Sequence, residues 1–85
     1  MDIVYTPKFV KTYRKLPLRI KLLCEKKEKI FANDPHDSRL KTHKLHGTMK
    51  DYWAFSIDYS YRIGFAFSNT DHILFHAVGT HNIYK

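Results

Sequence analysis

The sequence predicts an α+β domain of order β-α-α-β-β-β, in which a helical hairpin packs on one face of a small, mainly antiparallel four-stranded sheet. Three observations support this fold class. A short β-branched segment opens the chain, two segments with helical periodicity follow, and the last third alternates between bulky and small side chains. A single domain, 1–85, is expected, because 85 residues is near the lower size that a hydrophobic core can hold alone.

The first third of the chain is expected to form one strand and two helices. The segment 2–5 (DIVY) is β-branched and aromatic, which is typical of a strand. Thr6 can cap a helix, and Pro7 suits the first helical position because its missing N–H needs no partner there. This helix should end at Pro17. A second helix should follow over about residues 18–32 and form an antiparallel hairpin with the first.

The remainder of the chain is expected to be a basic loop followed by three strands. Residues 36–51 have no regular period, and Gly47 should take a turn conformation that other residues resist. The strands are predicted where bulky and small side chains alternate, at residues 52–58, 61–67 and 72–78. The bulky side chains should meet the helices. The other face carries small residues around a cation and an acid, which would leave room for a ligand: Ala54, Ser56, Asp58, Arg62, Gly64 and Ala66.

The composition predicts a polyanionic partner, because the net charge is +7 and the pI is about 9.6, although a basic surface that serves only solubility would have the same charge. More than half of the lysines and arginines lie in residues 8–29, where they form either a solvated helix face or a phosphate-contacting face. Among them Lys27 interrupts the apolar stripe of the second helix, and its long stem can carry the charge outward. The single cysteine, Cys24, cannot form an internal disulfide, which suits a reducing cytosol. With no signal peptide and no apolar run of about 20 residues, a cytoplasmic protein without a membrane partner is expected.

Six histidines raise the question of a metal site. His43 and His46 could chelate one ion only if their loop bends suitably. His72 and His76 share a strand face but are separated by about 13 Å of extended chain, too far for one ion. With Cys24 as the only cysteine, no zinc pattern is present. The sequence therefore predicts neither a metal nor another cofactor.

Bases and cations that can cleave RNA without a metal are present. Such cleavage needs a base for the 2′-hydroxyl proton, cations for the phosphate and an acid for the leaving 5′-oxygen. His43 in the loop, Arg62 on the small-residue face, and His81 with Tyr84 after the last strand are the candidates. A meander of strands would bring them together, although each histidine could equally be a surface residue without a catalytic role.

Two segments resemble a known family. The segment HKLHGTMKDYWAFSIDYSYRIGF, residues 43–65, resembles the shared segment of RelE/ParE-superfamily toxins, with a K-L-x-G turn, an aromatic pair and then Y-R-I/L. The ending VGTHNIY, residues 78–84, is similar to the closing motif of the YafQ-like branch. The resemblance covers nearly the whole chain. It implies the RelE-like fold and a toxin of a type II toxin–antitoxin system, held inactive by a cognate antitoxin.

The resemblance also implies roles for individual residues. His81 matches the closing-motif histidine and would be the principal proton-transfer residue, with His43 as its partner. Arg62 would stabilise the phosphate, and Tyr84 would stack on or orient the substrate. Further contacts to RNA or its phosphates are expected from the basic loop residues Lys41, Lys44, His46 and Lys50. The implied partners are the antitoxin, the ribosome and mRNA.

Departures from the family pattern keep three hypotheses open. YafQ-like enzymes carry an aspartate and a histidine where this chain has Ala54 and Ser56, and a further acidic position falls on Ser60. RelE-like enzymes have an arginine near residues 56–58, and this chain has none. The leading hypothesis is a ribosome-dependent mRNA endonuclease with a reduced catalytic set, in which nearby groups such as Asp58 compensate. The others are a ParE-like toxin that inhibits DNA gyrase, and a degenerate member that binds its antitoxin without activity.

Overall fold

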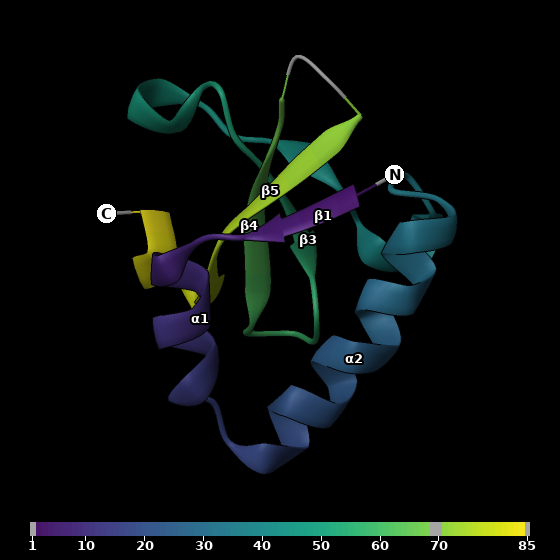
Figure 1. Cartoon of the computed structure of the whole chain (residues 1–85), viewed down its shortest axis with the longest axis vertical. Coiled ribbons are helices and arrows are strands. Elements are labelled where there is room, and N and C mark those ends of the chain that lie inside the picture. Colours follow the sequence, from purple (N-terminus) through teal and green to yellow (C-terminus); the bar gives the residue numbers. More distant parts are fainter. Residues whose placement is uncertain (1, 69–70, 85) are drawn as a thin grey trace.

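The computed structural model describes residues 2–68 and 71–84, with only the backbone described at positions 82 and 84. Two helices pack against a five-stranded, mostly antiparallel sheet, which confirms the predicted α+β fold class (Figure 1). The elements in chain order are β1 (Asp2–Tyr5), α1 (Pro7–Arg14), α2 (Leu18–Asn33), η1 (Ser38–Leu40), β2 (His43–Lys44), η2 (Gly47–Met49), β3 (Trp53–Ser56), β4 (Arg62–Phe67), β5 (His72–Gly79) and η3 (His81–Tyr84), where η marks a 3₁₀ turn.

The strands lie in the order β1-β5-β4-β3-β2. β1 runs parallel to β5, and the other neighbouring strands are antiparallel. The predicted count of four strands is corrected to five by β2, which lies inside the segment expected to be a loop. In β2, His43 pairs with Ala54 and Lys44 pairs with Trp53. A strand of two residues is too short for the alternation of side chains to be visible in the sequence.

The start of α1 confirms the predicted cap. Thr6 Oγ1 accepts a hydrogen bond from the Phe9 N–H at 3.1 Å, and Pro7 occupies the first turn. The same hydroxyl lies 3.0 and 2.9 Å from the carbonyl oxygens of Phe75 and His76 in β5. These contacts tie the beginning of α1 to the edge of β5 at the point where β1 ends. In Figure 1 the two helices then diverge from their connection as the arms of a V, so each reaches the sheet separately.

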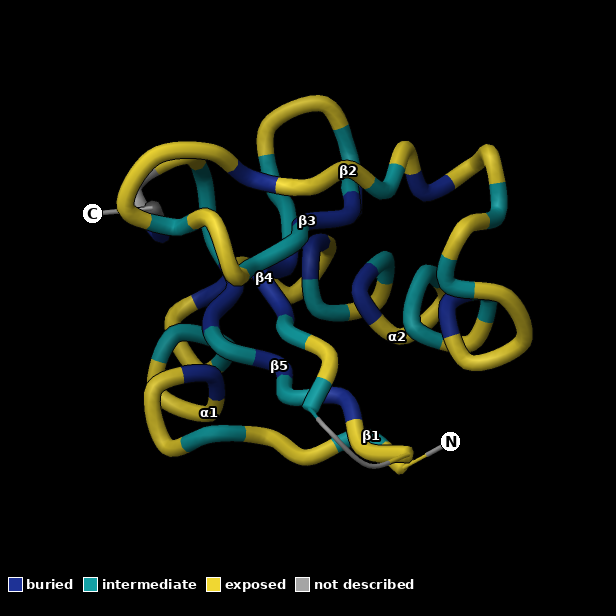
Figure 2. The backbone as a smooth tube through the Cα atoms, turned by 90° about the horizontal axis from the view of Figure 1, so that it is seen from above, coloured by how far each residue is buried: buried dark blue, intermediate teal, exposed yellow. Residues whose placement is uncertain are grey.

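The core is a cluster of aromatic rings between the helices and the bulky face of the sheet. Phe31 of α2 lies 4.6 Å from Phe55, 4.9 Å from Phe65 and 5.4 Å from Phe75, measured between ring centroids. All four rings are fully buried, and burial of each stabilises the fold by roughly 1.5–3 kcal/mol. Figure 2 shows the buried stretches gathered in the central strands. The bulky face therefore meets the helices, as predicted.

The small-residue face is partly covered by the chain's own C-terminal turn. Ala54 and Ala77 are 0% exposed. A Cβ atom on Gly64 would lie 3.6 Å from Ile83 Cδ1, and one on Gly79 would lie 3.0 Å from Ile83 Cγ2. The expectation that small residues leave this face free for a ligand is therefore corrected: at Gly64 and Gly79 they accommodate Ile83. The Arg62 end of the face remains open, because a hollow begins there.

Candidate functional site

A hollow of about 630 Å³ lies at the corner of the sheet where β3 turns into β4. We call it the cationic hollow, because four of its lining side chains are lysine or arginine and one is acidic. It lies between α2, the η1 turn with the residue that follows it, and the β3–β4 hairpin. The lining residues are Lys27, Arg39, Lys41, Ser56, Ile57, Asp58, Tyr59 and Arg62.

Arg62 is the cation of this hollow in which one nitrogen atom lacks a hydrogen-bond partner among the described residues. In the sheet it lies opposite Ser56 on β3 and Gly79 on β5. Its Nε atom is buried and has no hydrogen-bond partner among the described residues. A buried donor left in this state costs about 1–3 kcal/mol, and more when the group is charged. Because the Arg62 side chain lines the hollow, its guanidinium is available to an anion bound there.

Lys41 lines the hollow and has an unusual backbone conformation. Its φ of 53° and ψ of 41° lie in the left-handed region, and it is the one non-glycine residue of residues 2–68 and 71–84 with a positive φ. Such conformations are uncommon outside glycine and are found disproportionately at functional sites. Here the turn ends η1, directs Lys41 to the hollow and leads the chain into β2.

Arg39 is held at the rim by its neighbour Asp37. Arg39 Nε donates to Asp37 Oδ1 at 3.0 Å, and Arg39 Nη2 donates to Asp37 Oδ2 at 2.9 Å. These side-chain bonds, with one from the Arg39 backbone N–H, lower the pKa of Asp37 to about 2. Asp37 therefore stays ionised and fixes the guanidinium of Arg39.

Asp58 shapes the β3–β4 turn, and its carboxylate is already engaged. Its Oδ1 atom accepts hydrogen bonds from the backbone N–H groups of Ser60 at 2.9 Å and Tyr61 at 2.7 Å. Its Oδ2 atom lies 3.6 Å from Arg19 Nη2. Burial opposes ionisation of Asp58, but the two backbone hydrogen bonds and Arg19 outweigh it and lower the pKa. Asp58 therefore contributes one negative charge to the lining, against four positive side chains.

His43 lies close to the rim of the hollow. Its Cα is at most about 7 Å from that of Lys41, because the two residues are two positions apart in the chain. His43 is exposed, and its Nδ1 lies 3.0 Å from the Lys41 carbonyl oxygen. Since a carbonyl only accepts, Nδ1 carries the hydrogen, and in the neutral ring Nε2 is left as a proton acceptor.

His81 lies on the opposite side of Arg62. Gly79 is the β5 partner of Arg62, and exposed His81 follows two residues later at the start of η3. Strand spacing and chain length together place the Cα atoms of Arg62 and His81 within about 12 Å. His43, Arg62 and His81 therefore border the same end of the sheet. The side chain of Tyr84, the fourth predicted catalytic residue, lies outside the described residues.

The remaining predicted contacts are spread more widely. Lys44 is opposite Trp53, so the register turns it to the face away from His43. His46 and Lys50 cap the two ends of η2 and are exposed, and neither lines the hollow. Sequence reasoning missed Arg39 as a site residue and noted Lys27 only as an interruption of the apolar stripe. That interruption was the available signal, whereas no sequence pattern indicates Arg39.

Among the described residues, no group of three or more histidine, cysteine, aspartate or glutamate side chains is arranged to hold a metal ion. Within the same part of the chain, none of the helices has the length and apolar character needed to cross a membrane.

The fold is shared with solved toxin structures. No family model and no curated protein matches the sequence. YafQ from E. coli strain BL21(DE3) superposes with a TM-score of 0.80 at 20% identity, covering 98% of this chain and 96% of YafQ. A YoeB/ParE toxin from Agrobacterium tumefaciens gives 0.79 at 19% identity, covering 95% of this chain and 99% of that toxin. A chain of the RelB–RelE antitoxin–toxin complex from Methanococcus jannaschii gives 0.74 at 24% identity, covering 96% and 95%.

These neighbours define the class of fold. The chain shares the α+β fold of the solved YafQ, YoeB/ParE and RelE structures, which is the fold that the resemblance in residues 43–65 and 78–84 implies.

Proposed function

We propose that this protein is the toxin of a type II toxin–antitoxin pair and cleaves mRNA on the ribosome without a metal ion. The observation that carries the proposal is the buried, unpartnered Nε of Arg62 beside the other cations of the hollow. An RNA phosphate is an anion of the right chemistry to satisfy it, because arginine binds phosphate oxygens through paired N–H groups. The toxin fold and the net charge of +7 support the same reading.

The proposed reaction is an attack by the RNA on itself. His43 Nε2 takes the proton of the 2′-hydroxyl, and the 2′-oxygen forms a bond to phosphorus. Arg62 and Lys41 stabilise the charge that develops on the phosphate oxygens. The bond from phosphorus to the 5′-oxygen then breaks, and protonated His81 supplies the proton that this oxygen needs. The products are a 2′,3′-cyclic phosphate and a 5′-hydroxyl.

The proposed partners follow from the same surface. The ribosome and mRNA supply phosphates for the hollow. A cognate antitoxin with an acidic or extended segment would cover it, because an acidic segment complements the +7 charge. The neighbouring RelB–RelE structure is itself an antitoxin–toxin complex.

A second candidate function is that of a RelE/ParE-like protein that binds its antitoxin without cutting RNA. The presence of Ala54 and Ser56 on β3 favours it, because neither side chain can transfer a proton near neutral pH.

The test is to add the purified protein to a translation reaction and map the 3′ ends of the mRNA. We expect new ends that carry cyclic phosphates, and we expect their loss in the folded variant His81→Ala. Intact mRNA would support the second candidate, and intact mRNA with inhibited gyrase supercoiling would establish a ParE-like activity instead. Retained cleavage by His81→Ala would remove His81 from the mechanism.

A further inference from the structure

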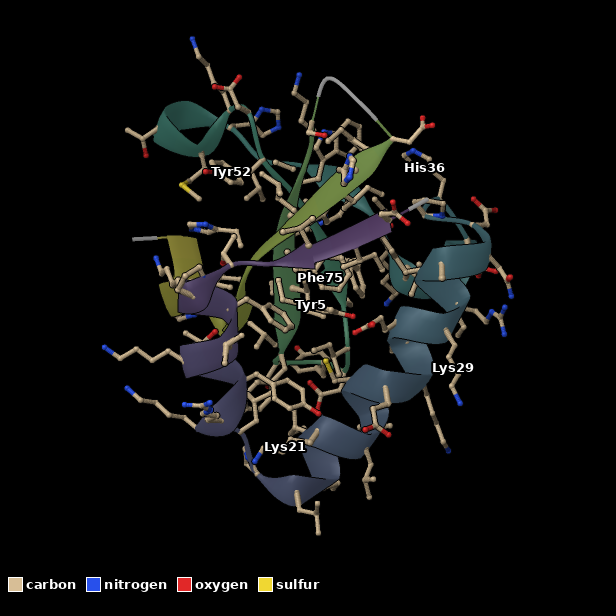
Figure 3. The ribbon with its side chains drawn as sticks, viewed as in Figure 1. Tyr5, Lys21, Lys29, His36, Tyr52 and Phe75 are labelled. Atoms are coloured by element: carbon tan, nitrogen blue, oxygen red, sulfur yellow. The ribbon has the colours of Figure 1, made fainter. Side chains whose placement is uncertain are left out.

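A second distinctive pair of side chains lies on the small-residue face of the sheet, away from the cationic hollow. The ring centroids of Tyr52 and His76 are 4.8 Å apart, and the rings are inclined at 45°. Both side chains are half-buried, and neither belongs to the hydrophobic core. Figure 3 shows Tyr52 on the side of the sheet that carries η3. The pair therefore presents two aromatic surfaces that the core does not use.

The position of His76 results from an irregularity in β5. Gly64 lies opposite Ala77 while Phe65 lies opposite Phe75, so His76 is an extra residue between two paired positions. Such a bulge re-aims a side chain, and bulges are frequent beside functional sites. The Thr6 hydroxyl lies 2.9 Å from the His76 carbonyl oxygen and fixes the backbone there. The imidazole is thus placed beside Tyr52 by features of the backbone.

The environment of His76 favours the neutral form of its imidazole. Its pKa is lowered, first by burial and then by the ammonium of Lys8, which faces it from α1. From the segment before β3, the ring of Tyr52 faces it. A neutral imidazole gains little from a phosphate, but its flat ring can stack on a nucleobase as the ring of Tyr52 can.

We propose that Tyr52 and His76 form a stacking subsite for one base of the RNA whose phosphate occupies the cationic hollow. This inference rests on the proposed function for its ligand. Tyr52 lies four residues before Ser56, the partner of Arg62, so about 13 Å of strand separates the two subsites. A short single-stranded segment spans that separation. Between the subsites it would pass over the surface formed by Ile83 and the small residues.

The test compares two fluorescent oligonucleotides of equal length by anisotropy. Both are short 2′-deoxy strands, which cannot undergo attack by a 2′-hydroxyl, and one of them has abasic sugars throughout. Wild-type protein should bind the strand with bases about tenfold more tightly, because bases stack on aromatic side chains and abasic sugars cannot. Tyr52→Ala and His76→Ala should lose this preference for bases. Their dependence on salt should stay unchanged, because the phosphate contacts remain.

Two controls separate stacking from structural damage. Tyr52→Phe keeps the ring and should keep the preference, and so should Phe67→Ala, which removes an aromatic side chain that is 45% exposed on the opposite face. If Tyr52→Ala fails to fold, Tyr52→Leu replaces it with an apolar side chain that cannot stack. Circular dichroism checks each fold.

The proposal is overturned if wild-type protein binds both strands equally or binds neither, or if the preference survives in both Tyr52→Ala and His76→Ala. The outcome is independent of the cleavage test. Base-dependent binding without mRNA cleavage would defeat the proposed function and keep the subsite. If the protein cleaves mRNA but neither Tyr52→Ala nor His76→Ala changes the preference for bases, the proposed function is kept and the stacking subsite is rejected.

Discussion

Replacing Arg62 by methionine should make the protein more stable and inactive at the same time. The methionine keeps most of the packing of the arginine stem but removes the buried Nε that has no partner among the described residues. Relief of that unmet hydrogen bond should raise the free energy of unfolding by about 1–3 kcal/mol. For a domain of this size, each kcal/mol corresponds to a rise in Tm of about 4–8 °C. Loss of a cation beside Lys27 and Lys41 should add to the gain at low salt.

Thermal unfolding and the translation assay measure the two effects on the same samples. Arg39→Met is the matched control, because Arg39 Nε already bonds to Asp37. That variant should lose affinity for RNA without any gain in Tm. Inorganic phosphate should stabilise wild-type protein more than Arg62→Met, since a ligand that binds only the folded state raises its stability. The reasoning is refuted if Arg62→Met has a lowered Tm, or if it still cuts mRNA at the wild-type rate.

Three further predictions concern close packing and burial. Gly79→Ala should lower the free energy of unfolding by about 1–3 kcal/mol in urea titrations, because its Cβ would lie 3.0 Å from Ile83 Cγ2. An unchanged midpoint would show that the Ile83 side chain moves aside without cost. Cys24 is 1% exposed and burial raises its pKa to about 12, so alkylation at neutral pH should be slow until the protein is unfolded. Ala54→Asp should leave little folded protein by circular dichroism, because position 54 is fully buried, whereas Ser56→His should fold and raise the cleavage rate.

Local features of the fold were predictable because neighbouring residues determine them. Thr6 and Pro7 begin a helix through contacts within one turn, and Gly47 has the expected positive φ of 71°. The β3–β4 turn contains no glycine. The Asp58 carboxylate instead stabilises it by accepting two backbone N–H groups of the turn.

The site was less predictable because it depends on contacts between distant segments. Lys27 and Arg62 come from a helix and a strand that the sequence separates, and Arg39 and Lys41 come from the η1 turn and the residue after it, which lie between them in the chain. The parity of β3 and β4 correctly places Arg62 beside Ser56. The alternation of side chains along a strand predicts which face each residue lies on. It does not predict which distant residue covers that face, so it could not show that Ile83 covers Gly64.

The two positions at which β3 departs from the YafQ-like pattern have different surroundings, and this difference bears on activity. Ala54 is enclosed, so a polar group there would be buried as well as absent. Ser56 instead lines the cationic hollow opposite Arg62. The cations of that hollow come from α2, from η1 and the residue after it, and from β4, and none comes from β3 itself. The absence of the β3 groups therefore removes candidates for proton transfer but leaves the four cations of the hollow in place, and the proposed chemistry then depends on the exposed histidines 43 and 81.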